Sequence, residues 1–149
     1  MHMTNNLWEI RAFVYDHFKE TTQPPSAEVT AARFDLTRDE AVSAYEELHQ
    51  RHAFFLEPGT HNILMANPFS SVETPFKVYL GNKTYFANCA WDSLGIPAAL
   101  HADAEIEATC SQSGHPIRLS VKDAKVSSSD TLVHFLVPFH EWYNDLVFT

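Results

Sequence analysis

The spacing of apolar residues near the N-terminus restricts this stretch to a helix that ends before two adjacent prolines. Apolar side chains recur three or four positions apart, at Leu7, Ile10, Phe13, Val14 and Phe18. This spacing places them on one face of a helix. Pro24 and Pro25 follow, and proline has no backbone N–H with which to continue a helix. The sequence therefore predicts a first helix that ends before Pro24.

Two further helices and a hairpin are predicted before position 67. Ser26 can cap a short helix through Phe34, and Thr37 with Glu40 forms a capping box for a third helix. The stretches 53–56 and 62–65 flank a turn-forming segment at 57–60, which is typical of a β-hairpin. Three helices followed by a hairpin predict a winged-helix-like lobe at residues 1–66.

Charge argues against the DNA binding that a winged helix commonly performs. Residues 1–75 carry five Lys and Arg side chains against eleven carboxylates, a net charge of −6, and the whole chain carries −9. The helix that would enter the major groove is also acidic. Affinity for nucleic acid and for anionic membranes comes mainly from Lys and Arg. We therefore expect a structural or dimerising role for this lobe, with neither nucleic acid nor a membrane as a partner.

The second half has a different pattern. A connecting segment rich in Pro, Ser and Asn suggests a linker at 67–75, and a second lobe should follow at 76–149. Alternating or apolar-rich stretches predict strands at 76–80, 84–86, 104–109, 116–121 and 131–137. Short helices are expected at 87–94 and at 138–145. Gly95 and Pro97 should end the first of these helices. A further extended stretch should begin at Leu146. The predicted class is α+β, with a mixed or antiparallel sheet in the second lobe.

Composition makes a self-sufficient core plausible. The chain has 149 residues, 45% of them hydrophobic, and contains no apolar run of 18 residues. A cytoplasmic protein is therefore the expectation. Cys89 and Cys110 are 21 positions apart, which matches neither a zinc finger nor a CxxC motif. Folding requires neither thiol, so the question is whether one of them has a catalytic or metal-binding role.

The segment around Cys89 is the candidate reactive site. Asn88 is a plausible N-cap, which would place Cys89 in the first helical turn, where free N–H groups and the helix dipole lower the pKa of a thiol. Asp92 is three positions further on and should share that helix face. The alternative is that Cys89 is a small buried residue and Asp92 only stabilises the helix N-terminus.

A family resemblance favours the reactive interpretation. The order and spacing of three runs resemble the alkylmercury lyase (organomercurial lyase) family: Asn88-Cys89-Ala90-Trp91-Asp92, Leu94-Gly95-Ile96-Pro97-Ala98, and the stretch from Ala108 through Cys110 to Gly114-His115-Pro116-Ile117. With the preceding lobe, the likeness covers nearly the whole chain. It implies that Cys89 and Asp92 are the catalytic pair and the residues that hold mercury. It implies for Cys110 a structural role, which we interpret as packing.

The resemblance also implies a reaction. A thiolate binds the soft ion Hg(II) better than oxygen or imidazole donors do, and an acid must protonate the leaving carbon. Substrates would be small organomercurials, small thiols would remove the product, and no cofactor is expected. The family places a second catalytic cysteine on the strand expected to begin at Leu146, and positions 146–149 contain none. Two alternatives stay open: a family member that lacks the second cysteine and binds a soft metal or small ligand or catalyses a different lyase reaction, and a winged-helix regulator that senses a ligand.

Other side chains in the second half are weaker candidates. Four histidines, at 101, 115, 134 and 140, could in principle join a cysteine in a Zn or Cu site, but their spacing favours no particular set. The aromatic residues Trp91, Phe139, Trp142 and Tyr143 could line an apolar pocket. Aromatic residues at helical spacing are usually core, and we expect that here.

Overall fold

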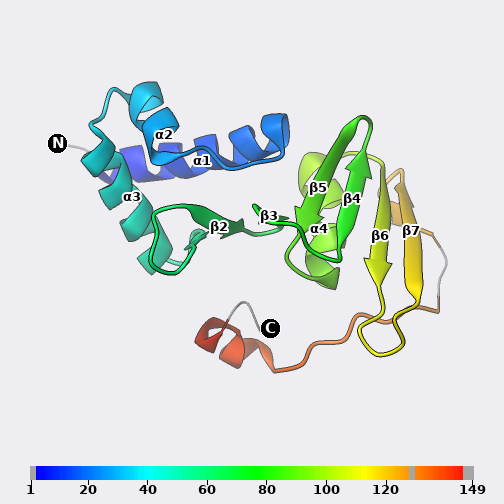
Figure 1. Cartoon of the computed structure of the whole chain (residues 1–149). Coiled ribbons are helices and arrows are strands. Elements are labelled where there is room, and N and C mark those ends of the chain that lie inside the picture. The colour runs from blue at the N-terminus through cyan, green and yellow to red at the C-terminus, as the bar shows by residue number, and fades with distance from the viewer. Residues whose placement is uncertain (1–2, 128–129, 146–149) are drawn as a thin grey trace. The chain divides into compact units, whose positions relative to one another are not determined.

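A computed structural model describes residues 3–127 and 130–145 and divides the chain into two compact units. Unit 1 is Met1–Glu73 and unit 2 is Thr74–Thr149 (Figure 1). The boundary lies within the predicted linker 67–75. Helices and antiparallel strands occur in the described chain, so the α+β class is confirmed.

Unit 1 begins with three helices, α1 (Met3–Thr21), α2 (Ala27–Phe34) and α3 (Arg38–Gln50). Ser26 Oγ accepts a hydrogen bond from the Val29 N–H at the start of α2. Thr37 and Glu40 form the predicted capping box, with the Thr37 N–H donating to Glu40 Oε2 at 2.8 Å. These side chains satisfy N–H groups that a helix start leaves without carbonyl partners, so the local sequence fixes where the helices begin.

Three short strands complete unit 1: β1 (Phe55–Leu56), β2 (Ile63–Ala66) and β3 (Phe69–Ser70). They pair antiparallel in the order β1-β2-β3. The hairpin was predicted, but β3 was not, because its two residues lie in the segment interpreted as a connection. Phe69 stacks on Phe18 of α1 at 5.3 Å between ring centroids, and both rings are buried. Burial of Phe69 against α1 therefore holds this segment to the unit 1 core.

Unit 2 contains the strands β4 (Lys77–Leu80), β5 (Lys83–Ala87), β6 (Ala104–Thr109), β7 (Pro116–Lys122) and β8 (Lys125–Val126). Their order is β5-β4-β6-β7-β8, and all neighbours are antiparallel. One sheet face is apolar, as Val78 and Ile106 are paired across β4 and β6 and both are buried. On β4 the residue beside Val78 points the other way, and the Tyr79 hydroxyl donates to the Glu107 carboxylate at 3.0 Å. This period-2 alternation is what one half-buried sheet requires.

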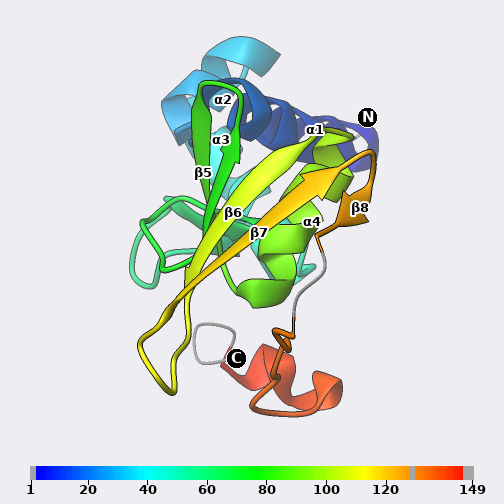
Figure 2. The same cartoon turned by 90° about the vertical axis from the view of Figure 1, so that its right-hand side faces the viewer.

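The helix α4 (Ala90–Leu100) contacts β4, β5 and β6 (Figure 2). The sequence predicted a helix over 87–94 that Gly95 and Pro97 would end, and this is wrong, because α4 continues through both residues. Pro97 removes one helical hydrogen bond, which costs about 3 kcal/mol. Ile96 and Pro97 are fully buried, and burying such side chains contributes roughly 1.5–3 kcal/mol each. Packing thus offsets the unfavourable local sequence.

The last described segment differs most from expectation. The predicted strand at 131–137 is wrong, since residues 130–138 form no strand, and the predicted helix at 138–145 is a short 3₁₀ helix, η1 (Phe139–Asn144). A strand needs a neighbour for its backbone groups, and no strand pairs with residues 131–137 in the described chain. The extended stretch expected from Leu146 lies outside the described residues. None of the described helices is long and apolar enough to cross a bilayer.

Candidate active site

Cys89 lies at the junction between β5 and α4, where it caps the helix itself. Its backbone is extended, at φ −151° and ψ 178°, and its Sγ accepts a hydrogen bond from the Asp92 N–H at 3.4 Å. Asn88 was predicted as the N-cap, and that assignment is wrong by one residue. The physical consequence is that the sulfur points back at the free N–H groups of the first turn.

Asp92 lies beside this sulfur on the first turn of α4. Its carboxylate accepts a hydrogen bond from Asn88 Nδ2 at 3.2 Å, and its backbone N–H is the donor to Cys89 Sγ. Both Cys89 and Asp92 are half-buried. A soft sulfur donor and a carboxyl group therefore lie near each other at the start of one helix, as their spacing of three residues predicted.

Burial raises the pKa of both members of this pair. It raises the pKa of the Cys89 thiol, and the neighbouring Asp92 charge adds to that effect, whereas the Asp92 N–H acts in the opposite direction. Burial also raises the pKa of the Asp92 carboxyl, opposed by the hydrogen bonds from Asn88 and Cys89. The predicted lowering of the Cys89 pKa is thus wrong, because desolvation and a nearby negative charge outweigh the helix N-terminus.

Cys110 occupies a different environment. It follows β6 in the turn to β7, where its N–H donates to the His115 carbonyl at 2.9 Å and its carbonyl accepts from the Gly114 N–H at 2.8 Å. The side chain is half-buried, as that of Cys89 is, and the interpretation of Cys110 as a packing residue stays a prediction. The Ser113 hydroxyl, followed by the Ser113 and Gln112 N–H groups, lowers the pKa of the Cys110 thiol.

The remaining candidates from the sequence do not form a metal centre. In the described part of the chain, no three His, Cys, Asp or Glu side chains gather closely enough to hold an ion. His134 and His140 are exposed, in the segment after β8. The aromatic residues expected in the core are largely exposed as well, with Trp91, Phe139 and Tyr143 among the exposed large side chains. The sequence did not reveal their exposure, because the predicted strand at 131–137 and helix at 138–145 would have packed the aromatic side chains into a core.

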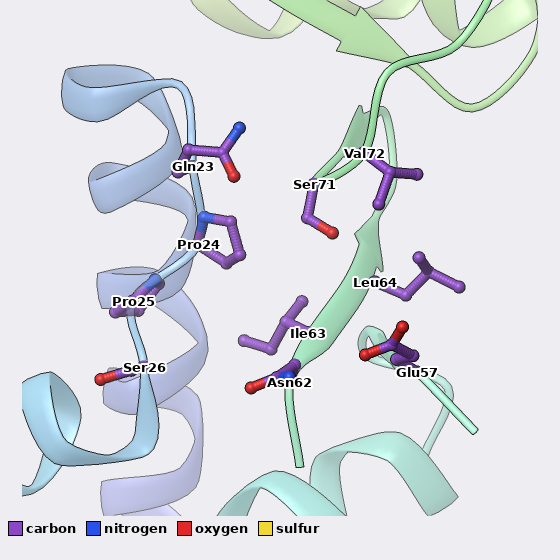
Figure 3. Close-up of a pocket in the computed structure, with 10 residues that line it drawn as sticks. All are labelled: Gln23, Pro24, Pro25, Ser26, Glu57, Asn62, Ile63, Leu64, Ser71 and Val72. Atoms are coloured by element: carbon purple, nitrogen blue, oxygen red, sulfur yellow. The ribbon is translucent and has the colours of Figure 1, made fainter. Parts of the chain in front are cut away.

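Two surface pockets lie away from this pair. One of about 270 Å³ in unit 1 is lined by the 23–26 segment and β2, with Gln23, Glu57 and Asn62 as polar groups (Figure 3). The other, of about 390 Å³ in unit 2, lies at the C-terminal half of α4 beside Pro97 and His101. Neither lining contains a cysteine, so neither offers the soft donor that mercury chemistry needs.

Comparisons with known proteins agree with this geometry. The family model of alkylmercury lyase, MerB, matches residues 69–149. Among solved structures, the chain is similar to one described as the crystal structure of the mercury-bound form of MerB2, with a TM-score of 0.68 and 23% sequence identity. That likeness, which shows a shared fold, covers 83% of this chain and 59% of the other.

The search of curated proteins finds no match. The family match alone spans more than half of the chain, and it includes Cys89, Asp92 and Cys110. The resemblance seen in the sequence is thereby confirmed, and the chain belongs to the alkylmercury lyase family.

Proposed function

We propose that the protein cleaves the carbon–mercury bond of organomercurials by protonolysis, with Cys89 as the sulfur that binds mercury and Asp92 as the acid. The observation that carries this proposal is that Cys89 and Asp92 lie together at the start of α4, where the Asp92 N–H donates to Cys89 Sγ at 3.4 Å and each side chain shifts the pKa of the other. Family membership supports the reaction type, and the contact supports these two residues as the ones that perform it.

The reaction balances with the proton that the site already holds. The Cys89 thiol gives its proton to Asp92 when the sulfur bonds to mercury. The carbon–mercury bond then breaks, its electron pair stays with carbon, and Asp92 delivers the proton to that carbon. A hydrocarbon leaves, and Hg(II) remains on Cys89 Sγ until a small thiol displaces it. A positioned acid of this kind contributes roughly 10²- to 10⁴-fold to a rate.

The raised pKa values fit these roles. A carboxyl group must be protonated to act as an acid, and burial raises the pKa of Asp92. A thiol with a raised pKa reacts slowly with ordinary electrophiles, because little of it is thiolate. Hg(II) bonds to sulfur strongly enough to displace the proton. The site would therefore combine low general reactivity with affinity for mercury.

The test is to incubate the full chain with a phenylmercury or methylmercury salt and excess small thiol, and to measure benzene or methane. We expect hydrocarbon release that Cys89→Ser abolishes and that the matched variant Cys110→Ser retains. Mercury bound by the wild type without hydrocarbon release would favour the soft-metal binder instead.

The same protein can be tested on duplex DNA at physiological salt, where retention would favour a winged-helix regulator. We expect no retention. In α3 the guanidinium groups of Arg38 and Arg51 pair with Glu28 and Glu47, each at 2.6 Å. Carboxylates thus neutralise the cations that would meet phosphates.

A further inference from the structure

A chain of ring contacts extends from Trp91 on the first turn of α4 to the segment after β8. Trp91 lies against Phe135 with 6.2 Å between centroids, and Phe135 stacks on Trp142 at 5.2 Å and 22°. Phe139 meets the Trp142 ring edge-on at 5.1 Å. Figure 2 shows the segment of Phe135 and Trp142, in orange to red, near one end of α4 within unit 2. The contacts join residues more than 40 positions apart.

These rings form a surface. Trp91 is 57% exposed and Phe135 is 40% exposed, although the two are in contact. Exposing large aromatic rings gives up the free energy that their burial would contribute, so an exposed group of them often marks a binding site. An aromatic ring can stack on another through its exposed face.

This surface begins on the helical turn that Cys89 caps. Trp91 lies between Cys89 and Asp92 in sequence, and its backbone N–H is among the donors to Cys89 Sγ. Mercury(II) with two ligands is linear, so an organic group bonded to mercury on Sγ projects away from the sulfur on the far side of the metal. The indole of Trp91 is the nearest large apolar side chain in the sequence to that atom.

We propose that Trp91 and Phe135 bind the organic group of the substrate, and that they make the enzyme favour aryl over methyl mercurials. This inference rests on the proposed lyase function. An aryl group offers a ring that can stack on an indole, whereas a methyl group offers none. A stacked ring pair corresponds to a preference of about 2- to 10-fold.

The experiment measures kcat/KM for phenylmercury and methylmercury salts with the full chain. We expect Trp91→Leu to lower the phenyl-to-methyl ratio about 2- to 10-fold, because cleavage of the phenyl substrate loses the stacking contribution and cleavage of the methyl substrate does not. Trp91→Phe should restore most of the ratio because it restores a ring. Phe135→Leu should lower the ratio as well, since it removes the second ring.

Leu132→Ala is the matched control, because Leu132 is 88% exposed in the same segment and is not aromatic. Its ratio should equal that of wild type. An unchanged ratio in both Trp91→Leu and Phe135→Leu, with both substrates cleaved, overturns the inference and leaves the lyase function standing. No cleavage of either substrate by the wild type overturns both.

Discussion

The two thiols of unit 2 receive the same kind of hydrogen bond and differ in acidity. Cys89 Sγ accepts from the N–H three residues ahead, at Asp92, and Cys110 accepts from the N–H three residues ahead, at Ser113. Nevertheless, the pKa of Cys89 is raised and that of Cys110 is lowered. Burial and the Asp92 carboxylate raise the pKa at the first site, whereas the Ser113 hydroxyl is the largest cause of the lowered pKa at the second. A backbone N–H donor is therefore not enough to lower the pKa of a thiol, because desolvation and the neighbouring side chains decide the sign.

The largest expected effect concerns Asp92, the proposed acid, which has no counterpart beside Cys110 among the causes that shift its pKa. Asp92→Asn should lower hydrocarbon release roughly 10²- to 10⁴-fold, because an amide cannot donate an acidic proton to the leaving carbon. The variant should still bind one equivalent of phenylmercury, since Cys89 is retained. Benzene release and mercury binding are measured on the same sample. Cleavage at the wild-type rate would remove Asp92 from the mechanism.

A second expected effect compares the thiols directly. At pH 7.5 iodoacetamide should modify Cys110 at least about tenfold faster than Cys89, because the thiolate is the nucleophile and Cys89 is both more protonated and more buried. Peptide mass spectrometry over time gives both rates from one reaction. Equal rates, or faster modification of Cys89, would contradict the claim that Cys89 has the higher pKa and the lower accessibility.

A smaller effect isolates the contribution of the carboxylate. Asp92→Asn removes the negative charge that helps to raise the pKa of Cys89, so alkylation of Cys89 should accelerate about two- to fivefold. Cys110 in the same protein is the internal control and should not change. Because burial is the larger cause, Cys89 should remain the slower thiol. If the alkylation rate of Cys89 is unaffected, the charge of Asp92 does not contribute to the raised pKa of Cys89.

The smallest effect concerns stability. The pKa of Asp92 is raised on folding, so the folded state holds that proton more tightly than the unfolded state does. Its contribution to stability is complete below the ordinary carboxyl pKa and is lost as pH rises through the raised value. Relative to Asp92→Asn, the wild type should therefore lose unfolding free energy between about pH 3 and pH 7, by less than about 1 kcal/mol. Urea unfolding of both proteins at the two pH values measures it, and a gain with rising pH would reverse the sign.

Local signals predicted the helix starts and the proximity of Cys89 to Asp92. The caps at Ser26 and Thr37 act within three residues, and the contact of Cys89 with Asp92 needs only one turn of helix. Such features depend on neighbours in sequence, and the sequence displays them directly.

Tertiary packing determined what the sequence did not reveal. α4 continues past Gly95 because Ile96 and Pro97 are buried, and the stretch 131–137 lacks the neighbouring strand that its alternation would require. The acidity of Cys89 was predicted with the wrong sign because burial cannot be read from spacing. Each difference arises from contacts between residues distant in the chain.

The most direct test of the account is a single turnover in D₂O with Cys110→Ser, in which Cys89 is the only thiol of the given sequence. The protein is mixed with one equivalent of phenylmercury and no added thiol. We expect about one equivalent of benzene carrying one deuterium, and an intact protein mass increased by one Hg(II). Absence of benzene, or an equal yield from Cys89→Ser, would contradict bond cleavage at Cys89.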